Sequence, residues 1–264
     1  MKPSGYFEPS LRHQQTILYL PSTGTDGTGA GIGPAWMTPV NVTVSHPTPT
    51  ASYIGQHRCT RFTSTAIGNL HLGVLFANAD HCCMWRGDDV TESRGGFYFV
   101  THFKVHALPG GSTDLRFFAG LSAQTGTGVA TSDTIPNNTV GLWCDTTDAY
   151  SLNLVTKGTG AATKTNLTNA TTLTAGTMYE FSMLANPTQS VIVTQLVDMD
   201  DDTDGPLGTI LNSQNVSATM PVNTAMMAPQ VGLSNGPTHI LGGDTALDIM
   251  KIYALPNLKR HPYQ

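Results

Sequence analysis

The densest group of ionisable residues in this sequence is an acidic run whose pattern could bind calcium. Asp200-Asp201-Asp202-Thr203-Asp204-Gly205 places carboxylates at the first, third and fifth positions and glycine at the sixth, like the first half of an EF-hand loop. The bidentate glutamate required at the twelfth position is absent, because Leu211 stands there. We therefore expect solvated acids at a hairpin tip, with a weak calcium site of Asp200, Asp202 and Asp204 as the alternative.

Histidine and cysteine side chains offer zinc-ligand chemistry without a complete ligand set. His81-Cys82-Cys83 has neither a Cys-x₂-Cys nor a His-x₃-His partner pair around it. His102 and His106 have that spacing, but on a strand they would lie about 13 Å apart, beyond the reach of one metal. With only four cysteines in 264 residues, we expect reduced, buried thiols rather than a disulfide framework.

Two patterns associated with hydrolases are incomplete, so we expect no enzyme activity. Gly232-Leu233-Ser234-Asn235-Gly236 resembles a nucleophile elbow, which needs a helix directly after the serine. Pro237 and Gly242-Gly243 prevent that helix, and a turn is expected instead. A glycosidase needs two carboxylates across a cleft, and glutamates are scarce. The chain has three of them: Glu8, Glu92 and Glu180. Glu180 falls inside a predicted strand, where we expect a structural hydrogen bond or ion pair.

Strands must position these side chains, because the composition and the spacing of apolar runs are typical of an all-β protein. Charged residues make up 12% and hydrophobic residues 39%, so threonine, serine, asparagine and glycine must cover much of the surface. Ten short runs rich in aromatic and β-branched residues alternate with glycine- and proline-containing turns, which predicts an antiparallel two-sheet sandwich or barrel. The runs are Arg61–Thr63, His71–Ala77, Gly96–Val105, Leu115–Ser122, Val140–Cys144, Tyr150–Val155, Met178–Leu184, Val191–Val197, Leu207–Leu211 and Ala246–Tyr253. Ala161–Gly176 has no apolar period and is expected to be a loop.

The first 58 residues differ from the rest and are predicted to form an irregular arm. They contain seven prolines, and residues 24–33 contain five glycines, which excludes a long helix or a central strand. Thr16–Leu20 could form one strand. We expect residues 1–58 to be an attachment arm, residues 59–255 the sandwich and residues 256–264 a C-terminal tail.

Charge and hydropathy exclude several classes of partner. Thirteen basic and 18 acidic residues give a formal net charge of −5 with no basic stripe, so nucleic acid is not an expected partner. No apolar run reaches the length that spans a bilayer, and the first residues lack the apolar run of a signal peptide. We expect a soluble chain made in the cytosol.

Six motifs between Arg61 and Tyr253 carry a resemblance to a known family. They are Trp85-Arg86-Gly87, Gly95–Val100, Phe118–Ser122, Val140–Leu142, Tyr179–Phe181 and Leu247–Tyr253. In order and spacing they are similar to those of bacteriophage virion proteins: tail fibre, head fibre or receptor-binding proteins with a concanavalin-like jelly roll. The vicinal Cys82-Cys83 and residues 1–58 depart from that family.

The resemblance implies a jelly-roll sandwich in a homotrimer around a threefold axis, with arms that grip phage capsid or tail proteins. The expected function is therefore that of a virion structural protein, a fibre or capsid-decorating protein made in the bacterial host. The alternative is a receptor-binding protein that adsorbs the phage to a host surface polysaccharide. Trp85, Trp143 or residues 161–176 would then contact sugar, because exposed aromatic rings stack on sugar rings.

Overall fold

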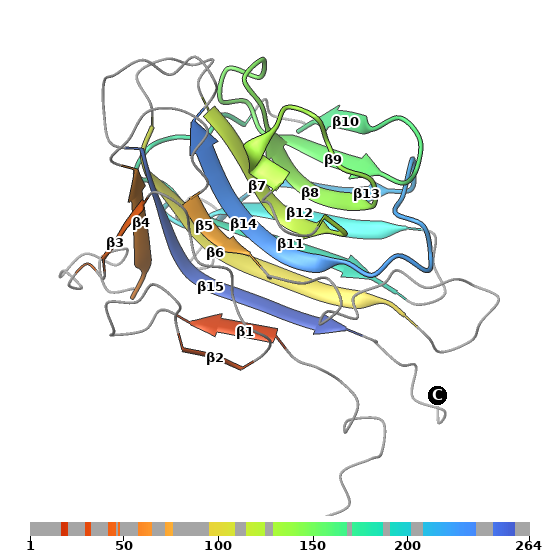
Figure 1. The fold of residues 1–264 in the computed structure, drawn as a ribbon, viewed down its shortest axis with the longest axis horizontal. Helices are drawn as coiled ribbons and strands as arrows, with labels where there is room; N and C mark the ends of the chain where they lie inside the picture. The colour runs from red at the N-terminus through yellow and green to blue at the C-terminus, as the bar shows by residue number, and fades with distance from the viewer. Residues whose placement is uncertain are drawn as a thin grey trace, which may run out of the picture.

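The computed structural model describes residues 17–20, 30–32, 42–45, 47, 58–64, 72–75, 95–108, 115–124, 129–167, 171–186, 191–201, 208–235 and 245–256. These residues form two antiparallel sheets packed face to face (Figure 1). The helical content of the described residues is one 3-10 turn, η4 (Val129–Thr131). None of their helices is long and apolar enough to cross a membrane. The predicted all-β, antiparallel jelly-roll sandwich is confirmed.

The larger sheet has nine strands, and its long central strands come from distant parts of the sequence. In order across the sheet they are β13 (Thr209–Val216), β12 (Ile192–Asp198), β11 (Met178–Ala185), β6 (Phe97–Ala107), β15 (Ala246–Pro256), β1 (Ile17–Leu20) and β2 (Ala30–Ile32). Two further strands, β4 (Thr60–Ser64) and β3 (Val42–Ser45), lie beside the other half of β15.

The smaller sheet has six strands and covers one face of the larger one. Its order is β10 (Thr163–Asn166), β9 (Asn153–Lys157), β8 (Thr139–Cys144), β7 (Leu115–Ser122), β14 (Ala228–Asn235) and β5 (Leu72–Leu75). Neighbours in the chain pair from β7 to β10, as hairpin turns predict. The β7–β14 pair instead joins segments more than 100 residues apart.

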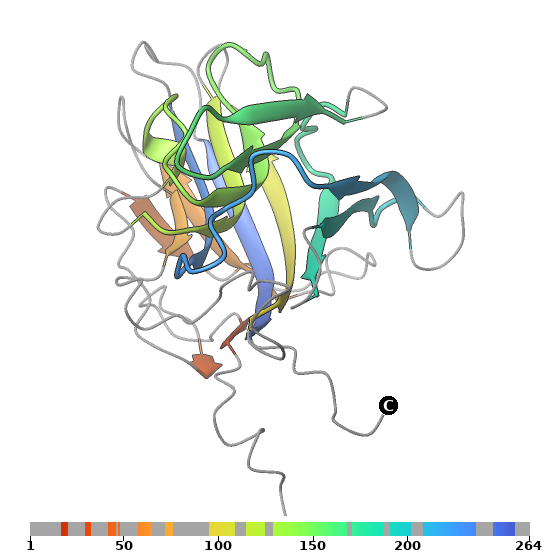
Figure 2. The same ribbon diagram turned by 90° about the vertical axis from the view of Figure 1, so that its right-hand side faces the viewer.

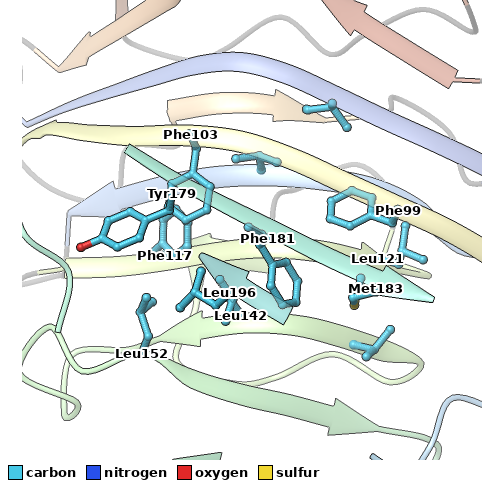
Figure 3. Close-up of a cluster of buried hydrophobic side chains, with 14 of the residues drawn as sticks. Phe99, Phe103, Phe117, Leu121, Leu142, Leu152, Tyr179, Phe181, Met183 and Leu196 are labelled. Atoms are coloured by element: carbon cyan, nitrogen blue, oxygen red, sulfur yellow. The ribbon is translucent and has the colours of Figure 1, made fainter. Parts of the chain in front are cut away.

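Aromatic side chains between the sheets hold the sandwich together (Figure 3). Phe103 of β6 packs against Phe117 of β7 with ring centroids 4.8 Å apart, and against Tyr179 of β11 at 5.6 Å. Phe99 meets the edge of Phe181 at 6.4 Å. Since β6 and β7 belong to different sheets, the Phe103–Phe117 pair is a direct packing contact between the two layers.

All ten predicted runs overlap strands, but the sequence did not predict four others. β14 was missed because Pro229 and Gly232 interrupt its apolar run; Pro229 is tolerated because it is the second residue, ahead of the stretch that pairs with β5. β10 lies inside the predicted loop 161–176, and it forms by pairing with β9 despite its exposed polar side chains. β2 and β3 lie in the predicted arm.

The described strands within residues 1–58, β1, β2 and β3, pair within the larger sheet. β15 has 11 residues, and β4 pairs only with Ala246–Ile249. The remaining edge of β15 is therefore open, and Ile17–Tyr19 of β1 pairs there with Ile252–Ala254. The other residues of the predicted arm, and those of the tail after Pro256, lie outside the described residues.

Candidate functional site

The face of the nine-stranded sheet that turns away from the core carries charged, polar and aromatic side chains. On β6, Phe99 and Phe103 lie in the core, so the alternating Tyr98, His102 and Lys104 point to the opposite side. The strand register places side chains of β4, β15 and β11 on the same side as these three residues. We call this surface the outer face. It comprises Arg61, Tyr98, His102, Lys104, Glu180, Ser182, Lys251 and Tyr253, and the buried Asp248 lies beneath it.

One row of the outer face combines an ammonium group, an imidazole and a carboxylate. Lys251, His102 and Glu180 are directly opposite one another on β15, β6 and β11. Nε2 of His102 lies 2.7 Å from Oε2 of Glu180, and both side chains are partly exposed. This hydrogen bond lowers the pKa of Glu180, outweighing burial, which raises it. The structural hydrogen bond expected for Glu180 is confirmed.

The next row is built around a fully buried carboxylate. Arg61 donates to Asp248 through Nε at 2.7 Å and Nη2 at 2.8 Å, a bidentate pair between β4 and β15. Nζ of Lys104 is 3.7 Å and Nδ1 of His106 4.0 Å from the same carboxylate. Burial lowers the pKa of His106, as does the charge of Arg61. Asp248 therefore fixes three strands relative to one another beneath the outer face.

Two tyrosines lie beside the ionic rows. The rings of Tyr98 and Tyr253 are 6.1 Å apart and tilted by 60°, and both are partly exposed. Burial raises the pKa of Tyr98, and so does the nearby charge of Glu180. Ring faces, hydroxyls, an imidazole, a carboxylate and an ammonium group thus lie on one surface. This set of groups can bind a ligand that has both apolar faces and hydroxyl groups.

Part of the corresponding face of the six-stranded sheet is covered by the chain itself. Trp143 and Phe118 meet edge to face at 6.3 Å and form one buried cluster with Val129, Ala130 and Ile135. Trp143 has no exposed surface, so the prediction that it stacks on sugar is wrong: residues 129–135 occupy the space in front of its sheet. Trp85, the other predicted sugar-binding residue, lies outside the described residues.

A second ionic cluster ties the β8–β9 connection to β10. Nζ of Lys164 donates to Oδ2 of Asp145 at 2.7 Å and to both oxygens of Asp148 at 2.9 and 3.0 Å. Asp145 also accepts from the Trp143 indole at 3.2 Å and from the Thr147 hydroxyl. Burial would raise the pKa of Asp145, but the hydrogen bonds from Lys164 and Thr147 lower it well below its ordinary value. The two carboxylates share one cation and brace the loop.

Acid should weaken this brace. Because the pKa of Asp145 is lowered in the folded state, its contribution to stability is present above the unfolded value of about 4 and is lost as the pH falls through the folded value. We expect Asp145→Asn to reduce the dependence of the melting temperature on pH below about pH 4. Thermal unfolding followed by circular dichroism over a pH series checks this. An unchanged pH dependence in the variant would show that other carboxylates dominate acid unfolding.

The predicted calcium ligands are only partly placed. Asp200 follows β12, and its Oδ2 accepts a hydrogen bond of 2.9 Å from the backbone of Met178. Asp202 and Asp204 lie outside the described residues. Within the described part of the chain, no group of three or more histidine, cysteine, aspartate or glutamate side chains could hold a metal ion. The calcium site stays a prediction.

The pattern that resembles a nucleophile elbow is part of a strand. Gly232–Asn235 forms the last four residues of β14, so the predicted turn is wrong for these residues. Ser234 is buried and its hydroxyl donates to the carbonyl of Ala130. The serine thus attaches η4 to β14, and it is not exposed to a substrate.

The described cysteines are free and buried, as predicted for reduced core residues. Burial and the charge of Asp248 raise the pKa of Cys59 to about 11, and burial raises that of Cys144 to about 12. Neither thiol is a nucleophile at neutral pH. In a Cys82→Ser/Cys83→Ser variant we expect a thiol reagent to label no cysteine in the native protein and two after denaturation. Rapid native labelling would contradict the burial of these two thiols.

No protein-family model and no curated protein matches the sequence. Among solved structures, the fold is similar to that of a protein of unknown function from Shewanella oneidensis MR-1, with a TM-score of 0.59, 14% identity and 99% of both chains covered. It is also similar to peanut lectin bound to a nine-residue peptide (TM-score 0.54, 10% identity, 94% of this chain and 100% of that chain). Arcelin-5, a lectin-like defence protein from Phaseolus vulgaris, gives a TM-score of 0.52 at 8% identity, with 94% and 99% covered. These likenesses show the fold, a lectin-like jelly-roll sandwich.

Proposed function

We propose that this chain is a non-enzymatic bacteriophage virion protein that displays its sandwich on the particle and binds host surface glycan through the outer face. The observation that carries the glycan proposal is the combination of the Tyr98–Tyr253 pair with the Lys251, His102 and Glu180 row. On the corresponding face of the other sheet, residues 129–135 cover Phe118 and Trp143. The aromatic rings of the outer face are therefore partly exposed, whereas these two rings are buried.

The groups of the outer face match those of a sugar. A pyranose has an apolar face of C–H groups, which stacks on aromatic rings, and a rim of hydroxyls, which both donate and accept hydrogen bonds. Glu180 accepts, Lys251 donates, and His102 does either according to its tautomer. The lectin fold of peanut lectin, a structure similar to this one, supports the same interpretation.

A binding role, rather than catalysis, is supported by how the carboxylates are used. Glu180 is hydrogen-bonded to His102, Asp248 is held by Arg61, and Asp145 and Asp148 share Lys164. Hydrolysis of a glycosidic bond needs one carboxyl group to donate a proton and a second to act as base or nucleophile. These four carboxylates are bound to cations or to a histidine within the fold.

The glycan proposal is tested by blocking the outer face with a single side chain. Ser182 lies on β11 in the row next to Glu180, and strand register places Val100 and Tyr253 in its own row. Arginine at this position would therefore add a long charged side chain beside both the His102–Glu180 pair and the tyrosines. Thr165→Arg adds the same charge to an exposed position of β10 in the other sheet and is the matched control. On an array of bacterial surface polysaccharides, we expect Ser182→Arg to weaken binding by about tenfold or more, while Thr165→Arg binds normally. Equal binding by both variants would place the site elsewhere.

The virion proposal is supported by the resemblance of the segment from Arg61 to Tyr253 to phage virion proteins. Its test is an N-terminal deletion that leaves β1 in place. Removing residues 1–58 would remove β1, β2 and β3 from the sheet. A loss of incorporation could then result from misfolding as well as from the loss of attachment. Removing residues 1–15 keeps all three strands. We expect this shorter deletion to leave thermal unfolding nearly unchanged and to abolish incorporation into phage particles. Normal incorporation would contradict attachment through this segment.

A further inference from the structure

One edge of the nine-stranded sheet has the properties of a strand that pairs with another chain. Among the described strands, β13 has a single neighbour, β12. The β12–β13 hairpin stands out on the right in Figure 2, away from the six-stranded sheet. An edge strand presents backbone donors and acceptors along its outer side, which makes it a template for further pairing.

β13 carries few of the features that protect an edge strand. Its eight residues, Thr209–Val216, include no charged residue and no proline. The register shift opposite Leu196 and Val197 is the one protective irregularity of this strand pair, and the stretch Asn212–Val216 beyond it is regular. Eight residues of uncharged strand are enough to form a pairing surface of ordinary length.

Most of the large apolar side chains that are exposed among the described residues lie on the same hairpin. Three large hydrophobic residues are exposed: Val193 at 39%, Ile210 at 51% and Met226 at 42%. Val193 belongs to β12 and Ile210 to β13, so two of the three lie on this hairpin. We propose that β13 pairs edge to edge with β13 of a second copy, joining two nine-stranded sheets into one.

Symmetry and charge favour a second copy of this chain as the partner. Two identical strands related by a twofold axis in an isologous contact run antiparallel. Asp198, Asp200 and Asp201 precede β13, and in an antiparallel pair the acids of the two copies lie at opposite ends of the strands. Eight residues of strand separate them by about 27 Å, several times the Debye length of about 8 Å. A parallel pair would instead bring the acidic segments together. The contact is twofold, unlike the threefold arrangement that the family resemblance implies.

The experiment is a mass measurement on edge variants. We expect light scattering coupled to size exclusion to give twice 28.0 kDa for the full chain, and 28.0 kDa for the double variant Ile210→Lys/Ser213→Lys, in which like charges meet across the pair. Both positions are exposed, so the fold tolerates the change, and thermal unfolding verifies this. Met226→Lys changes the third exposed hydrophobic residue, outside both strands, and should retain the wild-type mass.

Three results would overturn the pairing. These are a wild-type mass of 28.0 kDa at every concentration, a mass three times that value, or a double variant with the wild-type mass. The mass of the full chain tests this contact independently of glycan binding, because the outer-face variant Ser182→Arg leaves β13 unchanged. Loss of glycan binding with a retained dimer, and the reverse, are therefore distinguishable.

Discussion

Gly120→Ala is expected to destabilise the protein severely, by about 3 kcal/mol or more, which corresponds to a fall in melting temperature of about 6–12 °C. Gly120 of β7 lies directly opposite Gly141 of β8. A methyl group on Gly120 would sit 2.6 Å from Cα of Gly141 and against the carbonyl of Val140, and 3.0 Å from the ring of Phe118. Two of these contacts are with backbone, so the strands themselves would have to separate.

Gly160→Ala is the matched control, because its methyl group would have no atom within 4 Å. We expect this variant to unfold within a degree or two of the wild type, since surface changes usually alter stability by less than about 0.5 kcal/mol. Thermal and urea unfolding followed by circular dichroism measure both variants. A stable Gly120→Ala protein would show that β7 and β8 do not approach as closely as the structure has them.

Asp248→Asn is the second change with a large expected effect, a loss of about 3–5 kcal/mol in the free energy of unfolding. The carboxylate is fully buried and holds Arg61 through two hydrogen bonds, with Lys104 close by. A neutral amide would leave a partly buried guanidinium without its counter-charge and would turn an amide group toward two cations. Urea unfolding measures the loss, and a change below about 1 kcal/mol would mean that solvent compensates for the pair.

A double variant distinguishes two quantities: the stability lost when one partner is left without the other, and the net contribution of the ion pair to the free energy of unfolding. Arg61→Met with Asp248→Leu removes both charges, and replacing a buried ion pair with apolar groups is often neutral or stabilising. We expect the double variant to recover most of the stability that Asp248→Asn loses. A double variant as unstable as the single one would indicate that the pair has a role beyond mutual neutralisation, such as fixing the position of β4 beside β15.

The sequence predicted the layers of the fold because strand periodicity is a local signal. The alternation of Phe97, Phe99 and Phe103 with Tyr98 and His102 follows from the pleat of a single strand, and the structure confirms its core side. β14 could not be predicted in this way, because pairing with β7 and β5 on both sides stabilises a segment whose own propensity is poor.

The candidate site could be predicted only in part, because its members meet through long-range register. Glu180 was correctly expected to make a structural hydrogen bond, but its partner His102 lies 78 residues away, and only the β6–β11 pairing brings the two together. Trp143 shows the opposite error. Exposure was inferred from residue type, whereas the chain places residues 129–135 over the ring.

The central claim, that the outer face binds glycan, is tested most directly by fluorine NMR of protein containing fluorotyrosine. The probe is the oligosaccharide that binds best on the polysaccharide array, and single Tyr→Phe variants assign the signals. We predict that the signals of Tyr98 and Tyr253 shift and saturate as the oligosaccharide is added, while that of Tyr179, buried in the core, stays constant. Saturable binding that leaves Tyr98 and Tyr253 unchanged would contradict the claim.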